Sequence, residues 1–451
     1  MPAADRFGVA GEARAPCWIG IDLGTSGCRA VAIDAAGALL AAARASLPPS
    51  RSGADGGREQ DPEDWWSATV AVLRDLTGRL LGHRCRALSV DATSATVLLA
   101  TPDGHPLGSA LMYDDRRAVA AAERVAALAP SASPARGASA SLAKVLYLRE
   151  RLAVDREVLV LHQADWVLGR LGARYGISDW NNALKLGFDQ VAEAWPDWLD
   201  GLALAPVRLP DVVAPGTPIG VLDPRLVEPT GLAAGTALVA GTTDSTAAVI
   251  ATGIATPGEA VTSLGSTLVV KVLSGTPVAD PSSGVYSHRF GDLWLAGGAS
   301  NSGGAVLRRF FDDDRIAQLS ARMDPEGSTG LDYYPLPAPG ERFPIADPTC
   351  APRLTPRPAD DLMFLQGLFE GIAAIEAAGY RRLAELGAPR PTRILTVGGG
   401  AGNSAWARIR ARKLGVPVGQ ARQQEAAYGA ARLALTASSG SSRPASVPGL
   451  S

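Results

Sequence analysis

Cysteine and histidine are scarce in this sequence of 451 residues, with four of each. The cysteines show no C-x-x-C spacing, and the histidines are isolated from one another. Such a pattern argues against a disulfide framework and against a zinc site. It is typical of buried or incidental thiols in a reducing compartment.

Long apolar runs and an excess of basic charge are also missing. No stretch approaches the roughly 18 uninterrupted apolar residues of a membrane-spanning helix, so no membrane span is expected. The formal net charge is −2 and basic runs are absent, so nucleic acid is not an expected partner. The N-terminal residues lack the apolar core of a secretory signal. We expect residues 1–17 to be a disordered extension, with an organellar address left open, and 445–451 to be a flexible tail.

The chain has enough residues for two to three domains with sizeable cores. Strand and helix signals alternate, which predicts an α/β fold with buried sheets. Asp61 can cap a helix that begins at Pro62, and residues 360–386 have the pattern of a second, long helix. The buried face expected for the first helix consists of Trp66, Val70, Leu73, Thr77 and Leu80.

Three polar clusters allow two interpretations each. Residues 112–117, Met-Tyr-Asp-Asp-Arg-Arg, fit a solvated helix start, which we favour, or a functional cluster. Residues 163–166 and 178–185 are expected to be loops that line something polar, or else their tryptophans belong to the core.

The strongest functional signal is a hairpin at residues 17–34. A strand runs into Asp22, turns through Gly24, Thr25, Ser26 and Gly27, and returns as a second strand. The small turn offers N–H groups and hydroxyls that suit phosphate oxygens. Asp22 fits better as a direct or water-mediated ligand of a phosphate-bound Mg²⁺. Taken alone, the motif fits an ordinary hairpin with a capping Asp equally well.

A second copy of this signal lies half a chain away. Residues 259–272 again form a strand, a small polar turn of Gly265, Ser266 and Thr267, and a strand. A repeat at this spacing predicts two related halves, each presenting a hairpin to one shared ligand. Two phosphate hairpins that face each other across a cleft would form a nucleotide clamp.

Two further strand ends carry chemistry. The strand 237–240 leads into Thr-Thr-Asp-Ser and an Ala-rich helix, where Asp244 is either a helix N-cap or a general base in phosphoryl transfer. The strand 393–397 is followed by Gly398, Gly399 and Gly400, and glycines at such a turn let a nucleotide approach the backbone.

Four motifs in this order resemble the FGGY carbohydrate kinases: residues 22–26, 241–245, 264–267 and 396–400. The resemblance spans roughly residues 18–436. Within the family, the segments 182–187, 284–288, 297–301 and 330–337 are most similar to the small D-ribulose kinases of cyanobacteria and plant plastids, once labelled xylulose-kinase-like. The chain departs from larger members in having Tyr113 where they often have Trp, and in being shorter.

The resemblance implies an α/β fold of two ribonuclease-H-like (actin/hexokinase-type) domains around a central cleft. Residues 18–251 plus 425–444 would form the N-terminal, sugar and catalytic domain, and 252–424 the C-terminal, nucleotide domain. The implied activity is phosphorylation of D-ribulose to D-ribulose 5-phosphate by ATP and Mg²⁺ in the cytoplasm, or in a plastid if the source is a plant or alga. Alternatives are a xylulose or other polyol kinase, or a non-catalytic ATP- and sugar-binding protein. The oligomeric state stays open.

The implied roles follow residue by residue. Asp22 would bind Mg²⁺ through water, Asp244 would be the catalytic base, and Ser94 would contact the ketose. His288 and the loop with Asn181 are further candidates for the sugar pocket. The nucleotide would be held by Thr25, Ser26, Gly265, Ser266, Thr267, Gly399, Gly400, Asn403 and Trp406.

Overall fold

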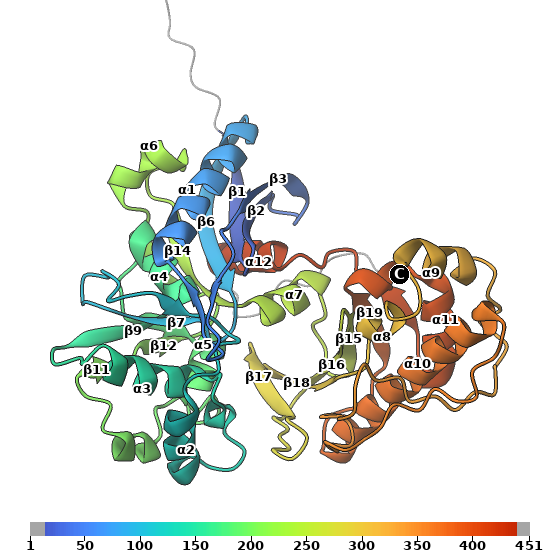
Figure 1. Cartoon of the computed structure of the whole chain (residues 1–451). Coiled ribbons are helices and arrows are strands. Elements are labelled where there is room, and N and C mark those ends of the chain that lie inside the picture. Colours follow the sequence, from blue (N-terminus) through green and yellow to red (C-terminus); the bar gives the residue numbers. More distant parts are fainter. Residues whose placement is uncertain (1–13, 440–451) are drawn as a thin grey trace, which may run out of the picture.

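The computed structural model describes residues 14–439, and they form two halves that lie side by side (Figure 1). Each half is built on a six-stranded mixed sheet. The first sheet has the order β13-β14-β6-β1-β2-β3, formed by Pro218–Val221, Ala237–Thr243, His83–Ala92, Ala15–Leu23, Gly27–Ile33 and Leu39–Ser46. The other has the order β17-β18-β16-β15-β19-β20, formed by Tyr286–Phe290, Leu293–Ser300, Leu268–Ser274, Glu259–Leu264, Arg393–Val397 and Val418–Gln420.

Both sheets repeat one topology. In each, an antiparallel hairpin (β1 with β2, β15 with β16) is extended by a further antiparallel strand (β3, β18), and the first strand of the hairpin pairs in parallel with a later one (β6, β19). The predicted repeat of two related halves, and the actin/hexokinase-type α/β fold, are therefore confirmed. Because β1 begins at Ala15, residues 15–17 belong to a strand and not to the expected extension. Residues 1–13 and 440–451 lie outside the described part of the chain.

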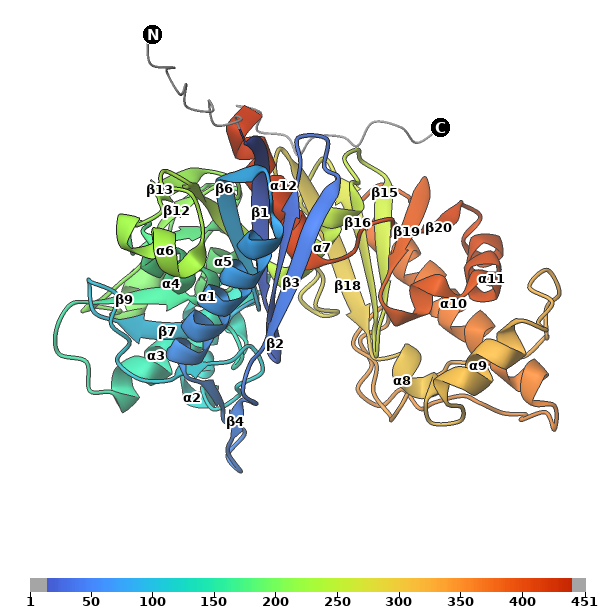
Figure 2. The ribbon, with the colours of Figure 1, turned by 90° about the horizontal axis from the view of Figure 1, so that it is seen from above.

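The helix α12, Ala426–Ser439, brings the end of the chain back to the first sheet. It packs against β1, β6 and α7 (Asp244–Thr252), and Figure 2 shows α12 and α7 between the two halves. The approach is close, since a Cβ on Gly20 would lie 2.0 Å from the carbonyl oxygen of Ala427, and one on Gly429 would lie 1.9 Å from that of Ala247. Only glycine permits such contact, so α12 packs closely against the first half in one defined position.

On the other face of the first sheet lies α1, Pro62–Arg79, which Asp61 caps as predicted. Its buried face agrees only in part with the prediction: Leu73 and Leu80 are buried, but Trp65 and Val72 are fully buried in place of Trp66, Val70 and Thr77, which are only partly so. The side chain of Trp66 instead lies under the guanidinium of Arg170, 4.8 Å from it. The helical period was right and its phase was wrong by about one residue, because both tryptophans fit an apolar stripe.

A second layer of the first half surrounds a smaller sheet of order β11-β9-β7-β8-β5-β4, with β10 and β12 paired beside it. Its strands are Val207–Arg208, Val158–His162, Val97–Ala100, Ala110–Leu111, Arg58–Gln60 and Arg51–Ser52, and the pair is Ile177–Asp179 and Asp211–Val213. The helices of the first half, besides α1, α7 and α12, are α2 Val119–Leu128, α3 Ser141–Arg151, α4 Gln163–Leu171, α5 Trp180–Ala183 and α6 Val227–Thr230.

One prediction in this layer was wrong, because residues 112–117 precede α2 and do not start it. Of the two interpretations of residues 163–166, the core one holds: they form the first turn of α4, and Trp166 lies in the core. A polar cluster beside a tryptophan therefore does not tell whether the segment forms a loop or a helix.

The second half carries α8 Gly304–Leu307, α9 Asp313–Ser320, α10 Asp361–Glu385 and α11 Ser404–Leu414. Residues 333–358 form a long proline-rich loop. Within residues 14–439, only α10 is long and apolar enough to cross a bilayer, but 72 % of its most apolar window is buried inside the structure, as in a core helix.

Candidate active site

Three carboxylates meet at one edge of the first sheet. Asp22 lies at the end of β1 and Asp91 at the end of β6, in register with each other. Asp244 begins α7 directly after β14, whose Thr242 is in register with Asp91. The strands β1, β6 and β14 are parallel neighbours, so their carboxyl ends share one edge. Ligand sites of open α/β sheets lie at this edge.

A cavity of about 630 Å³ opens at this edge, and both Asp22 and Asp244 line it. Two residues distant in the chain thus face one space, as the predicted mechanism requires. The lining residues are Asp22, Gly24, Thr25, Arg29, Thr93, Ser94, Tyr113, Lys185, Asp244, Ser245, Ala248, Gln424, Glu425 and Ala426. All of them come from the first half or from the segment that enters α12.

Asp22 and Asp91 differ in how they are compensated. The guanidinium of Arg29 lies 3.0 Å from the Asp22 carboxylate, and the pKa of Asp22 is raised because burial outweighs this partner. Asp91 is fully buried, and within the described residues neither of its carboxylate oxygens accepts a hydrogen bond. Burial, reinforced by the charges of Asp22 and Asp244, raises the pKa of Asp91 well above its usual range.

Asp244 occupies the first turn of α7, where Thr243 and not Asp244 holds the N-cap position. Its carboxylate accepts a hydrogen bond of 2.6 Å from the backbone N–H of Ser245. Burial raises the pKa of Asp244, and this hydrogen bond and the ammonium groups of Lys271 and Lys185 oppose that shift. A carboxylate with a raised pKa that faces a cavity is suited to accept a proton.

The first hairpin turn is braced by its own half. The N–H of Gly24 donates to the carbonyl of Gly27 (3.0 Å), and the side-chain amide of Gln60 donates to the carbonyl of Thr25 (2.8 Å). Thr25 lines the cavity, whereas Ser26 is exposed beside it. The turn is thus held by bonds to its carbonyl oxygens.

The second turn is braced in the same way from α8. The backbone N–H groups of Gly304 and Ala305 donate to the carbonyl oxygens of Gly265 (2.8 Å) and Ser266 (3.1 Å). Gly265, Ser266 and Thr267 are not part of the lining around Asp22, since they belong to the other half.

The glycine turn at residues 398–402 has two faces. Nothing lies within 4 Å of a Cβ built on Gly399, whereas one on Gly400 would meet Leu264 and Trp406 at 2.9 Å. Trp406 is buried beneath the turn and stacks on Phe369, with ring centroids 4.5 Å apart. Its ring therefore packs under the glycine turn and does not border the open space over Gly399. Asn403 caps α11 by accepting from the N–H of Trp406 (2.9 Å).

Of the residues predicted for the sugar pocket, Ser94 lines the cavity. Ser94 lines the cavity together with Tyr113, and the buried ammonium of Lys144 holds both neighbourhoods by donating to the carbonyls of Ala95 (3.0 Å) and Met112 (2.6 Å). Burial lowers the pKa of Lys144 to about 7. Of the other residues predicted for this pocket, Asn181 and His288 are buried and lie outside this lining.

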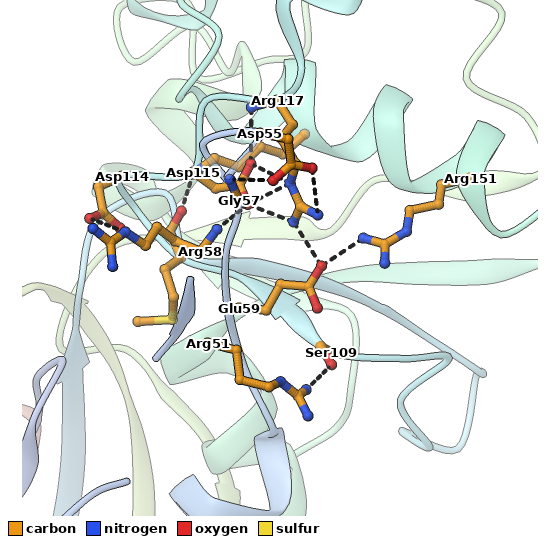
Figure 3. Close-up of polar contacts among 12 residues, drawn as sticks. Arg51, Asp55, Gly57, Arg58, Glu59, Ser109, Asp114, Asp115, Arg117 and Arg151 are labelled. Atoms are coloured by element: carbon orange, nitrogen blue, oxygen red, sulfur yellow. Dashed lines mark hydrogen bonds and ion pairs between the residues drawn. The ribbon is translucent and has the colours of Figure 1, made fainter. Parts of the chain in front are cut away.

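The segment 112–117 is a rigid support and not a solvated helix start. Asp115 is fully buried and receives the guanidinium of Arg117 at 2.7 Å and the N–H of Arg58 at 2.8 Å. Figure 3 shows Glu59 between Arg117 and Arg151, at 2.8 and 2.6 Å. This network ties β5 and α3 to the loop that carries Tyr113. The alternation of acids and arginines was visible in the sequence, but its partners on β5 and α3 were not.

The sequence matches the patterns of a known protein family. The pattern of the N-terminal domain of the FGGY family of carbohydrate kinases matches residues 17–251, and that of the C-terminal domain matches residues 260–438. The chain belongs to the FGGY family. The C-terminal match includes α12, although α12 packs on the first sheet. In this FGGY kinase the end of the C-terminal sequence match therefore belongs, in space, to the first half.

Relatives and solved structures agree with this assignment. A xylulose kinase of Streptomyces rubiginosus is 28 % identical over 428 residues, which cover 90 % of this chain and 85 % of the relative. The fold matches a ligand-bound xylulose kinase from Lactobacillus acidophilus (TM-score 0.82, 19 % identity, 95 % of this chain and 91 % of that one). It also matches a Plasmodium falciparum glycerol kinase with ADP (TM-score 0.82, 15 % identity, 95 % and 90 %). As an FGGY kinase, the chain is a phosphotransferase that acts on sugars with ATP.

Four residues of the site were missed or left without a role by sequence reasoning: Asp91, Arg29, Lys185 and Glu425. Asp91 carried a usable signal, because like Asp22 it is an acid at the end of an apolar strand. Lys185 lay in a segment that was quoted only for its family likeness. No group of three or more potential metal ligands occurs within residues 14–439.

Proposed function

We propose that this FGGY kinase phosphorylates a free ketopentose, with D-ribulose to D-ribulose 5-phosphate as the leading reaction. The observation that carries the proposal is the shared cavity, in which Asp22 and Asp244 face one space beside Ser94. Likeness in the segments 182–187, 284–288 and 297–301 supports D-ribulose. The second candidate is D-xylulose, which the name of the Streptomyces rubiginosus relative favours.

In the proposed reaction, Asp244 accepts the proton of the terminal hydroxyl of the ketose. The hydroxyl oxygen forms a bond to the γ-phosphorus of ATP, the bond from that phosphorus to the β,γ-bridging oxygen breaks, and ADP leaves. Such a transfer depends on positioning and on neutralising charge. Ser94 and Tyr113 would hold the sugar, while Thr25 and Ser26 would approach the phosphate from the first turn.

A divalent cation fits beside Asp22. The carboxyl groups of Asp22 and Asp91 lie against each other, and among the described residues Arg29 is the only cation that pairs with Asp22. Asp22 would hold Mg²⁺ through water, with Asp91 behind it, and the ion would supply charge neutralisation at the phosphates of ATP.

We further propose that residues 18–251 with 425–444 act as the sugar and catalytic unit and 252–424 as the nucleotide unit. The open space over Gly399 and the braced turn at Gly265, Ser266 and Thr267 suit a nucleotide on the second half. Closure of the halves would bring the second turn to the cavity and exclude water.

The test is a substrate screen with ATP and Mg²⁺. D-ribulose, D-xylulose, other pentuloses, pentoses, polyols and glycerol are compared by ADP release, and the sugar product is identified by NMR. We expect the highest kcat/KM with D-ribulose and phosphate on its terminal hydroxyl. A clear preference for D-xylulose would move the assignment to the second candidate. Binding of ATP and sugar without any sugar phosphate would overturn the kinase proposal.

A further inference from the structure

Among the described residues, Lys185 is the one cation of the cavity lining that has no carboxylate within ion-pair distance. The lining holds five charged residues: Asp22, Arg29, Lys185, Asp244 and Glu425. Arg29 is engaged by Asp22 at 3.0 Å. Within residues 14–439, no carboxylate lies within ion-pair distance of the Lys185 ammonium, although it is near enough to Asp244 to influence it electrostatically.

A second lysine reaches the same place from the other half. Lys271 lies on β16, and its ammonium donates to the carbonyl of Ser245 at 3.0 Å. Opposite Lys271 on β18 stands Gly297, where a Cβ would lie 3.0 Å from the Cγ of Lys271, so a glycine leaves room for the lysine. Two lysines, one from each half, therefore flank the first turn of α7 at Asp244.

Stability of α7 does not explain this placement. The N-terminus of a helix carries partial positive charge, so cations there are unfavourable. The positive charges in this region also repel one another. His288 is buried near both lysines, and its pKa is well below its usual range because of burial and then because of the charges of the two lysines. Lys185 and Lys271 both act on Asp244, but among the described residues Lys185 has no carboxylate within ion-pair distance, which indicates that a further anion completes the site.

The chemistry of the reactants identifies that anion. A free ketose is neutral and offers an ammonium nothing to neutralise, whereas the γ-phosphoryl group is anionic throughout the transfer. If Asp244 accepts the proton of the attacking hydroxyl, the phosphorus under attack must lie next to that hydroxyl, beside Asp244. Charge-assisted hydrogen bonds from a fixed cation are strongest where charge accumulates in a dry site.

We propose that Lys185 contacts the transferred phosphoryl group on its acceptor side and stabilises it as it passes from ATP to the sugar hydroxyl. The inference rests on the proposed function. Lys185 donates hydrogen bonds to the equatorial phosphoryl oxygens and exchanges no proton with them. Lys271 is a positioning residue, which holds the turn that carries Asp244.

The test compares Lys185→Met and Lys185→Arg with Lys413→Met. Lys413 is an exposed lysine on α11 and serves as the matched control for loss of one charge. With the best sugar of the screen, Lys185→Met should lower kcat about a hundredfold and change the KM for the sugar less than about threefold, because an interaction made in the transition state is lost. Lys185→Arg should recover part of kcat, and Lys413→Met should match the wild type.

A binding measurement makes the test independent of the identity of the sugar. Calorimetry with Mg-ADP alone and with Mg-ADP plus fluoroaluminate, a mimic of the phosphoryl group in transfer, gives the enhancement due to the mimic. We expect Lys185→Met to lose at least tenfold of that enhancement and to bind Mg-ADP alone as the wild type does. A rise in sugar KM with unchanged kcat, or an enhancement equal to that of the wild type, would overturn the proposal. If no sugar is phosphorylated but the enhancement is lost, the proposed function fails while the role of Lys185 stands.

Discussion

The two sheets have one topology, but their buried acids are treated in opposite ways. In the second half, Glu376 on α10 is fully buried and receives the guanidinium of Arg410 through two bonds of 2.6 Å. The same cluster includes Thr262 on β15 and Thr396 on β19, which are paired in register and bond to Glu376 and Arg410. In the first half, the corresponding strands β1 and β6 pair Asp22 with Asp91, and among the described residues no guanidinium or threonine hydroxyl bonds to Asp91.

This difference separates a structural cluster from a functional one. A buried charge is retained without cost to stability only if it is paired and hydrogen-bonded. The second half meets that condition within its own residues and can use its acid to join a helix to the sheet. In the first half, Asp91 is buried without a donor from a basic or amide group of the described residues, directly behind the cavity that Asp22 and Asp244 line. The acids of the first half should therefore matter for chemistry, and those of the second half for stability.

The largest effect is expected from Asp244→Ala. Loss of the base should lower sugar phosphorylation about a thousandfold, because a positioned general base contributes roughly 10²–10⁴. The affinity for ATP should stay close to that of the wild type, since Asp244 faces the acceptor side. Turnover is measured by ADP release and ATP binding by calorimetry. Near-normal turnover would refute the assignment of the base.

Asp312→Ala is the matched control in the other half. Asp312 is an exposed acid at the start of α9, where it accepts from the N–H of Arg315 at 2.7 Å. Its loss should cost about 1 kcal/mol of stability as a lost helix cap and leave kcat unchanged. An equal loss of turnover in both variants would show that the effect of Asp244 is structural, and the comparison of the halves would fail.

The site could be predicted from the sequence where a single strand and turn carry it. Asp22, Asp244 and the two hairpins were found in this way, because each is a local pattern of strand, small residues and acid. Partners on other strands were not found, since Asp91 meets Asp22 only through the parallel register of β1 and β6. Burial was the other gap: Trp406 follows a glycine turn just as an adenine-stacking residue would, but its ring packs on Phe369.

The second prediction breaks the paired cluster. Arg410→Met leaves Glu376 as an isolated buried carboxylate and should cost about 3–5 kcal/mol, seen as a lower midpoint of thermal unfolding. Replacing both Glu376 and Arg410 by Met should cost less than the single change, because no charge stays buried. Arg353→Met, at an exposed pair with Asp332, should cost no more than about 1 kcal/mol. A single change as mild as Arg353→Met would mean that the buried pair adds little.

The smallest effect has the opposite sign. Asp91→Asn removes a buried charge, and its amide can donate to the carboxylate of Asp22, so we expect the midpoint of thermal unfolding to rise by about 2–4 °C at pH 8. The pKa of Asp91 is raised in the folded protein, so folding takes up a proton above the unfolded value of about 4, and the stability of the wild type falls as pH increases through that window. The advantage of Asp91→Asn should therefore be small at pH 5 and larger at pH 8.

Added Mg²⁺ sharpens the same measurement. If a divalent cation compensates Asp22 and Asp91, Mg²⁺ should stabilise the wild type more than Asp91→Asn and narrow the difference between them. Asp155→Asn, at an exposed acid of a loop, should show neither the pH dependence nor the response to Mg²⁺. If the wild type and Asp91→Asn had the same midpoint of thermal unfolding at both pH 5 and pH 8, the charge of Asp91 would already be compensated in the folded protein. The first half would then resemble the second, with its acids serving the fold as Glu376 does.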